Sequence, residues 1–165
     1  MDGKQLAESV RRKVKEFTKL CAGIDEGTAS RAPAGRWSPK QIVSHLCGPE
    51  GVSPVSAFRV IIEKDIPEIH IEPGNPFFSD ARSKTSFADL LREFEKIYEE
   101  RADFIAGLQP EQLGRKGHIP ALKDSPLGEY PTLGALVQGI GEYHLSSHID
   151  HLREILAALG ASPKS

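Results

Sequence analysis

The sequence has few cysteines and no long apolar run, and each absence excludes a class of protein. Its two cysteines, Cys21 and Cys47, have no paired spacing, so we expect neither a disulfide framework nor a cysteine-based zinc site. No stretch approaches the roughly 18 apolar residues that a membrane span needs, and the opening run MDGKQLAESVRRKV contains no apolar signal core. We therefore expect a soluble, cytoplasmic protein.

The sequence also lacks an excess of either charge. Its 21 Lys and Arg residues nearly balance 23 Asp and Glu residues, which gives a formal net charge of -2. Since nucleic acids and anionic membrane surfaces attract strongly basic proteins, we expect neither as a partner. With 39% hydrophobic and 27% charged residues, the chain has the composition of a globular protein. Its length of 165 residues predicts one domain over residues 1–165.

Apolar side chains do occur at helical spacing through most of the chain. They recur every three or four residues, as on one face of a helix, in four segments: about 5–21, 39–62, 86–108 and 133–159. Two long loops rich in Gly and Pro, at about 64–85 and 109–131, separate the last three segments. We therefore predict an all-α, antiparallel four-helix bundle with two long loops. Whether both loops lie at the same end depends on the helix directions, which the sequence leaves open.

The second helix has the clearest start in the sequence. The run SPKQ at residues 38–41 combines a capping serine, a proline at the first helical position and a glutamine three residues after the cap. Pro49 lies about ten residues further on and lacks a backbone donor, so we expect a kink or break there. In the loop that follows, the run Glu68–Glu72 resembles a very short strand without an evident partner.

Three of the six histidines stand on the fourth helix, within a stripe of apolar residues. At about 100° per residue, His148 lies about 40° from His144, and His151 lies about 20° to the other side of it. A buried polar group without a partner costs about 1–3 kcal/mol. We therefore expect these imidazoles to find partners inside the bundle.

Two histidines at positions i and i+4 project from one helix face, which suits a metal ion. The third ligand must come from a neighbouring helix, and His45 on the second helix is the leading candidate. Three neutral imidazoles suit zinc, nickel, iron or copper and leave positions open for water or substrate. The alternative is a metal-free cluster in which the histidines hydrogen-bond one another and backbone carbonyls.

Two segments of the chain resemble a known family. GRWSPKQIVSHL at residues 35–46 and HLSSHIDHL at residues 144–152 are similar to the DinB-like superfamily of four-helix bundles, which includes the YfiT-type metal-dependent proteins. The family pattern has a Trp-Ser/Thr helix start followed by a His, and a His-x-x-x-His pair on the last helix. Together with the order and length of the helices, the similarity covers essentially the whole chain.

The resemblance implies a divalent metal, nickel or zinc, held by His45, His144 and His148. Family members with known chemistry are thiol-dependent transferases or isomerases that use bacillithiol, mycothiol or glutathione, while many others have no established reaction. His151 stands where the family often has Gln, and its role is open between a fourth ligand, a hydrogen-bond partner of a ligand and a core residue. A homodimer is a further family-level expectation.

We therefore expect metal-dependent thiol chemistry, an S-transfer from a low-molecular-weight thiol to a small electrophilic substrate. Two alternatives remain: a metal-dependent hydrolase of small amides or esters, and a non-catalytic bundle that binds metal or ligand as a dimer.

The sequence contains no obvious general base, and four residues are candidates for catalytic roles: Glu50, Arg59, Arg101 and His151. Glu50 lies five residues past His45, whereas Arg101 interrupts an inward apolar stripe. Each arginine either neutralises a carboxylate of the thiol or substrate, or packs its stem while its charge reaches solvent.

Overall fold

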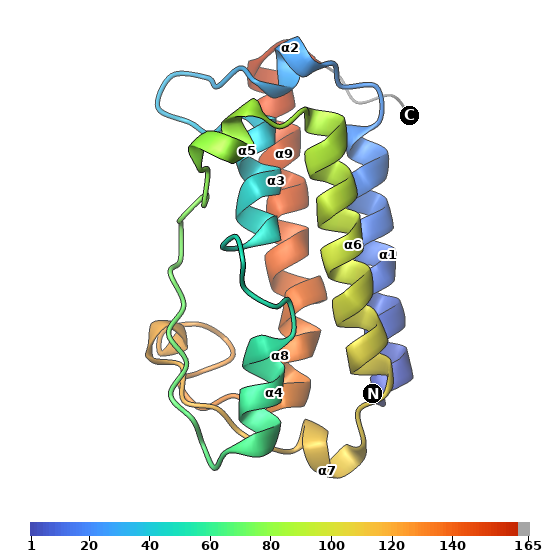
Figure 1. The fold of residues 1–165 in the computed structure, drawn as a ribbon, viewed down its shortest axis with the longest axis vertical. Helices are drawn as coiled ribbons and strands as arrows, with labels where there is room; N and C mark the ends of the chain where they lie inside the picture. The colour runs from blue at the N-terminus through green and yellow to red at the C-terminus, as the bar shows by residue number, and fades with distance from the viewer. Residues whose placement is uncertain (162–165) are drawn as a thin grey trace.

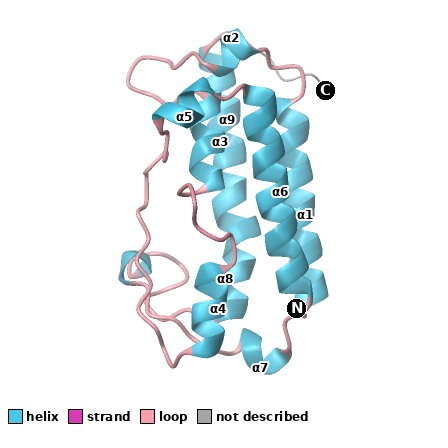
Figure 2. Cartoon of the chain, viewed as in Figure 1, coloured by secondary structure: helices cyan, strands magenta, loops and turns pink. Residues whose placement is uncertain are grey.

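Four helical columns run side by side along the long axis of the molecule (Figures 1 and 2). The structure, a computed structural model, describes residues 1–161. The columns are α1 (Gly3–Cys21), α3 (Pro39–Cys47) with α4 (Ser56–Glu63), α6 (Phe87–Ala106), and α8 (Leu133–Gly139) with η2 (Ile140–Leu145) and α9 (Ser146–Ala158). The connections contain the short helices α2 (Glu26–Ala29), α5 (Asp80–Lys84) and α7 (Pro110–Leu113) and the single turn η1 (Pro120–Leu122). No strand forms within residues 1–161, so the predicted all-α four-helix bundle is confirmed.

The columns do not simply alternate in direction. α1 and α8–α9 run toward one end of the bundle, whereas α3–α4 and α6 run toward the other (Figure 1). The packed neighbours α3 and α6 are therefore parallel. A parallel pair needs a connection that returns along the length of the bundle, and residues 64–86 supply it.

The two long loops meet at one end of the bundle. The backbone N–H of Ile69 donates to the carbonyl of His118 at 2.8 Å, and the N–H of His118 donates to the carbonyl of Pro67 at 2.8 Å. Glu68 forms an isolated bridge with His118, so the run Glu68–Glu72 has a partner but forms no strand. The loops therefore start from a shared end, and the first then carries the chain to the opposite end.

The second column is broken, as Pro49 predicts. α3 ends before Gly48, whose φ of 74° suits glycine, and α4 begins only at Ser56. The predicted capping box is also present. Ser38 Oγ accepts from the Gln41 N–H at 3.1 Å, and Gln41 Oε1 accepts from the Ser38 N–H at 2.8 Å. These two bonds fix the first turn of α3 and therefore the position of the turns after it.

The fourth column departs from its predicted course in the middle. η2 is π-helical, a wider turn than an α-helix, and the Ser146 hydroxyl donates to the Gly141 carbonyl across it at 3.1 Å. From the last residue of this turn onward, the core face passes through five buried residues: Leu145, Ile149, Leu152, Ile155 and Leu156. The prediction that the histidines occupy the middle of the core-facing stripe is therefore wrong. They lie along its edge, with His144 exposed and His148 and His151 half-buried.

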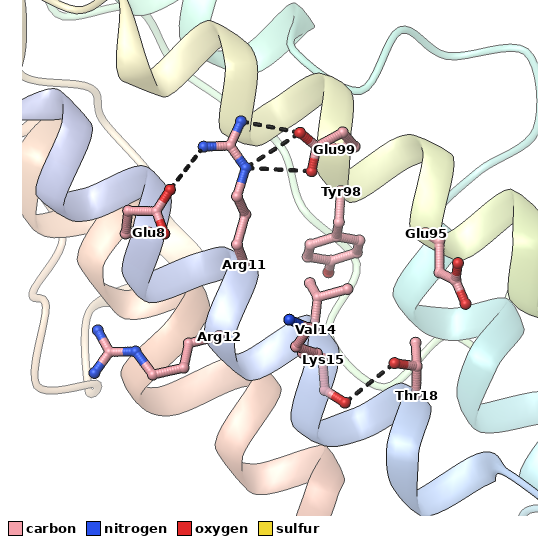
Figure 3. A pocket seen from close by; sticks show the side chains of 9 residues that line it. All are labelled: Glu8, Arg11, Arg12, Val14, Lys15, Thr18, Glu95, Tyr98 and Glu99. Atoms are coloured by element: carbon pink, nitrogen blue, oxygen red, sulfur yellow. Dashed lines mark hydrogen bonds and ion pairs between the residues drawn. The ribbon is translucent and has the colours of Figure 1, made fainter.

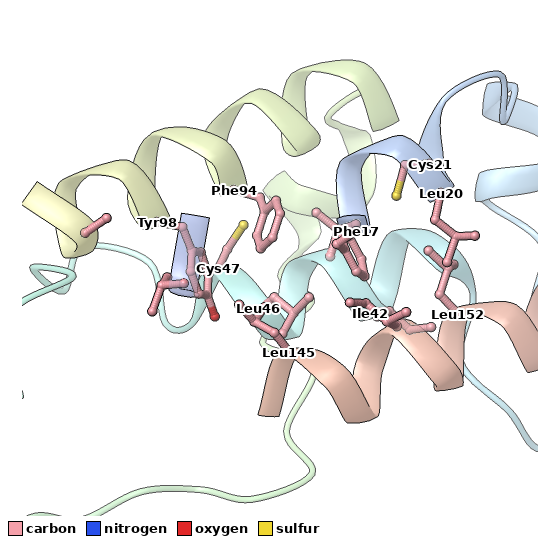
Figure 4. Close-up of a cluster of buried hydrophobic side chains, with 14 of the residues drawn as sticks. Phe17, Leu20, Cys21, Ile42, Leu46, Cys47, Phe94, Tyr98, Leu145 and Leu152 are labelled. Atoms are coloured by element: carbon pink, nitrogen blue, oxygen red, sulfur yellow. The ribbon is translucent and has the colours of Figure 1, made fainter. Parts of the chain in front are cut away.

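A continuous apolar core fills the space between the columns (Figure 4). Phe17 of α1 and Phe94 of α6 meet there with ring centroids 5.1 Å apart. α1 and α6 approach so closely at Gly3 that a Cβ at this position would lie 2.4 Å from the carbonyl oxygen of Ile105. Within residues 1–161, no helix is both long enough and apolar enough to cross a membrane.

Candidate metal centre

His45 lies in the last turn of α3, where three residues hold its ring. Its Nδ1 lies 2.6 Å from the carbonyl oxygen of Asn75. Because a carbonyl oxygen only accepts, this contact places the proton on Nδ1 and leaves a free lone pair on Nε2. The Trp37 ring packs at 5.3 Å between centroids, and the Phe77 ring lies nearly parallel at 6.3 Å. The tautomer and orientation of His45 are therefore fixed by its surroundings.

Two histidines of the fourth column face the His45 ring. The centroid of His144, from η2, is 5.3 Å away and that of His148, from α9, is 4.7 Å away. The Nε2 atoms of His45 and His144 are 3.2 Å apart, and one ring nitrogen from each of the three histidines lies within 4.8 Å of the others. The structure thus brings together the three predicted ligands. One of them stands on the π-helical turn, a feature that often marks functional sites.

The spacing of these nitrogens fits a single ion. In a tetrahedral zinc site with bonds of about 2.0–2.1 Å, two ligand nitrogens lie about 3.3–3.4 Å apart. The 3.2 Å separation of His45 Nε2 and His144 Nε2 is close to this value. The third nitrogen lies within 4.8 Å of the other two, a limit wider than this spacing, so the fit is shown for the His45 and His144 pair. Imidazole donors suit zinc, copper, iron and nickel alike.

The crowding of the rings lowers the pKa of all three imidazoles. Desolvation, followed by repulsion from His45 and Arg101, lowers the pKa of His144 to about 4. Desolvation and the neighbouring histidines lower the pKa of His148 to about 3, and desolvation also lowers the pKa of His45 against the opposing bond to Asn75. Neutral imidazole is the form that binds metals. The exposed surface of His144 leaves the cluster open to solvent on that side.

His151 lies beside the three-histidine cluster and contacts one of its members. Its Nδ1 is 3.4 Å from Nδ1 of His148, and its ring centroid is 5.8 Å from that of Trp37. Desolvation and the charge of Arg36 lower the pKa of His151, and Glu154 opposes them. The contact matches the expected role of a hydrogen-bond partner to a ligand better than that of a fourth ligand.

The other three catalytic candidates make their contacts elsewhere. Glu50 accepts from the Ser79 hydroxyl, and Arg59 is exposed with its guanidinium 5.4 Å from the centre of the Phe104 ring. Arg101 donates from Nε to the Pro54 carbonyl at 3.0 Å. These contacts give no support to catalytic roles, although the charge of Arg101 reaches His144.

Two surface cavities are separate from the histidines. A charged groove of about 740 Å³ lies between α1 and α6, with Arg11, Tyr98 and Glu99 among its lining residues (Figure 3). A cavity of about 240 Å³ lies at the break between α3 and α4, beside Glu50 and Arg82. No histidine lines either of them. The histidine cluster is instead bordered by aromatic rings from the loop before α3 and from the first long loop.

Sequence reasoning missed the residues that surround His45. It placed Trp37 only at the start of a helix, and it assigned no role to Asn75, Phe77 or Arg82. Asn75 acts through its backbone carbonyl, which any residue type carries, so no residue pattern marks it. A bulky residue with positive φ, such as Phe77 at 49°, is also invisible in a sequence.

Comparison with solved structures identifies the fold. The chain superimposes on YfiT from Bacillus subtilis, described as a probable metal-dependent hydrolase with an unusual four-helix bundle topology, with a TM-score of 0.68 and 21% sequence identity. The match covers 97% of this chain and 87% of that one. No protein-family model and no curated protein sequence matches the chain. The expected resemblance is therefore confirmed at the level of the fold: the chain has the YfiT-like four-helix-bundle fold.

Proposed function

We propose that this chain is a divalent-metal-dependent enzyme in which His45, His144 and His148 hold the ion. The observation that carries the proposal is the 3.2 Å approach of two ring nitrogens, one of which has its lone pair freed by the bond to Asn75. The description of YfiT as a probable metal-dependent hydrolase supports metal use by this fold. Without an ion, the same approach serves as an N–H···N hydrogen bond, which is the metal-free alternative.

The openness of the cluster favours an enzyme over a purely structural site. Structural zinc sites are closed by four protein ligands, whereas catalytic sites have three and keep a position for water or substrate. One nitrogen from each of three histidines converges here, and the exposed His144 leaves solvent access. This arrangement argues against the non-catalytic, metal-binding dimer.

A bound divalent ion would supply positive charge that lowers the pKa of a thiol or a water molecule close to it. The chain's own residues orient the ligands: the Asn75 carbonyl holds His45, and His151 contacts His148. Trp37 and Phe77 cover the His45 ring and exclude water from those faces. Within residues 1–161, no carboxylate hydrogen-bonds the three histidines to serve as a general base.

Because no carboxylate hydrogen-bonds the cluster within residues 1–161, we favour thiol transfer as the reaction. A thiol ionises more readily than water, so it depends less on a separate proton acceptor. We therefore propose an S-transfer from a low-molecular-weight thiol to a small electrophile, with nickel or zinc as the metal. Hydrolysis of a small amide or ester is the second candidate, and the description of the structural neighbour favours it.

Metal analysis tests the site. Protein purified without a nickel column is compared with His45→Ala, His144→Ala and the control His70→Ala, which alters an exposed loop histidine. We expect about one ion per chain in the parent and control and none in the two cluster variants. A parent that stays free of metal after incubation with zinc, nickel or manganese refutes the proposal in favour of the hydrogen-bonded cluster.

Activity assays then separate the chemistries. The loaded protein is mixed with glutathione and an electrophilic aryl halide, and separately with p-nitrophenyl acetate without thiol. Metal-dependent thioether formation supports S-transfer, and metal-dependent release of p-nitrophenol supports hydrolysis. Loaded protein that is inactive with broad panels of both substrate types favours the non-catalytic bundle.

A further inference from the structure

A buried arginine contacts the last turn of α3, the turn that contains His45 (the His45 turn). Arg82 belongs to α5 and is 3% exposed. Its Nη1 lies 2.6 Å from the Gly48 carbonyl, 3.2 Å from the carbonyls of Ser44 and Phe77, and 3.3 Å from the Ser44 hydroxyl. One guanidinium nitrogen therefore gathers acceptors from the end of α3 and from the first long loop.

These acceptors surround His45 on both sides. Ser44 precedes it on α3, and the N–H of Gly48 donates to the His45 carbonyl at 3.1 Å. Phe77 stacks on the imidazole ring and stands two residues after Asn75, whose carbonyl accepts from Nδ1. The arginine thus joins the helix that carries the ligand to the loop that orients it.

The loop segment that orients His45 contains a residue with an unfavourable backbone conformation. Phe77 has a φ of 49°, a left-handed conformation that bulky residues rarely adopt. Its N–H donates to Asn75 Oδ1 at 2.8 Å, and its carbonyl accepts from the Ser44 hydroxyl at 3.1 Å as well as from Arg82. A strained residue persists only where its surroundings fix it, and the buried guanidinium is one of these constraints.

Ion pairing alone does not explain the place of this arginine. Its closest carboxylate contacts are 3.7 Å to Glu50 and 3.6 Å to Glu93, both longer than a charge-assisted hydrogen bond. Its Nε is buried and has no hydrogen-bond partner within residues 1–161. The shortest bond goes instead to the Gly48 carbonyl, at the end of α3, where a cation also interacts favourably with the helix dipole.

We infer that Arg82 is a positioning residue for the histidine cluster: it fixes the Asn75–Phe77 turn against the end of α3, so that Asn75 holds the His45 Nε2 toward His144. The inference rests on the proposed function, because the metal is what this orientation serves. Arg82 acts through His45 and is not itself a ligand.

Lys40 provides a matched control for a purely structural role. It is also 3% exposed and lies on α3. Its ammonium group donates to Glu26 at 2.8 Å and to the Ser83 carbonyl at 3.1 Å, away from the His45 turn. Replacing it removes a buried cation from the same helix without removing any hydrogen bond that Arg82 makes to Ser44, Gly48 or Phe77.

The first measurement is zinc affinity by chelator competition, together with the Tm of the metal-free protein. Four chains are compared: the parent, Arg82→Lys, Ser44→Ala and Lys40→Met. We expect Arg82→Lys to weaken zinc binding about 10–100-fold, as the loss of a partner that orients a ligand does. Ser44→Ala removes one bond to Phe77 without touching a charge and should weaken zinc binding less. Lys40→Met should lower the Tm and leave the dissociation constant within about twofold.

The second measurement needs no metal. In the metal-free parent, the Nδ1 proton of His45 should give a slowly exchanging NMR signal because it donates to Asn75. We expect Arg82→Lys and Ser44→Ala to speed its exchange and Lys40→Met to leave it unchanged. If the parent binds neither zinc, nickel nor manganese, the proposed function fails, whereas the exchange rate of the His45 proton still tests the role of Arg82. If the parent binds zinc and both site variants keep its affinity and the slow proton, only the inference about Arg82 is overturned.

Discussion

The metal-free protein should lose stability in acid because of His148. Its pKa is about 3 in the folded chain against 6.5 for an unperturbed histidine. The unfolded chain therefore binds more protons than the folded chain between pH 6.5 and about 3. The stability that neutral His148 contributes is fully present above pH 6.5 and falls as the pH drops through this range. From pH 6.5 to 4.5 the loss is at most about 2.7 kcal/mol, at about 1.4 kcal/mol per pH unit. Because the ring is only half-buried, we expect about 1–2 kcal/mol.

The assay is equilibrium urea unfolding at both pH values with a chelator present. His148→Asn keeps a polar side chain but cannot titrate, so its stability should fall by about 1–2 kcal/mol less than that of the parent over the same interval. His70→Asn, which alters an exposed histidine, serves as the control for the loss of a histidine. An identical pH dependence in the parent and His148→Asn would falsify the reasoning, because acid loss would then come from other groups.

Three further predictions concern the metal, a helix contact and the thiols. Zinc at about 100 times its dissociation constant should add about 2.7 kcal/mol of stability, or about 5–10 °C in Tm, and calorimetry should find no such shift in His144→Ala. Gly3→Ala should lower the free energy of unfolding in urea by about 1–3 kcal/mol, because its Cβ would meet a carbonyl oxygen at 2.4 Å. Gly107→Ala is the control, since the closest atom to its Cβ is at 3.7 Å. Equal stability of the two variants would contradict the prediction. Burial raises the pKa of Cys21 and Cys47 to about 12, so Ellman's reagent should modify them only as the chain unfolds, and rapid modification of native protein would refute their burial.

The sequence predicts the helices well because their signals are local. The capping serine Ser38, the break at Pro49 and the apolar spacing each depend on a few neighbouring residues. The π-helical turn at Ile140–Leu145 could not be predicted, because apolar spacing does not distinguish a short π-helical turn from the α-helix around it. That turn moves the histidines from the middle of the core face to its edge.

The candidate ligands can be predicted from the sequence, whereas the residues that surround them cannot. His144 and His148 lie in the same column at positions i and i+4, a spacing that is typical of metal ligands. His45 follows a recognisable helix start. The partners that orient His45 act through the Asn75 carbonyl and through Arg82, which is far from it in sequence. Backbone groups and long-range contacts produce no pattern of residue types in the sequence, so only the structure reveals them.

The packing of the first column against the fourth has a consequence for folding during synthesis. α1, the first column synthesised, packs against η2 and α9, the last, and the site joins histidines 99 positions apart. A growing chain therefore contains His45 long before either partner leaves the ribosome. Contacts at such separation form late in folding, so the three histidines come together only after the fourth column has packed. Under the proposed function, metal uptake in a translation time course would report the packing of the fourth column, since a fragment that ends before it contains only one of the three histidines.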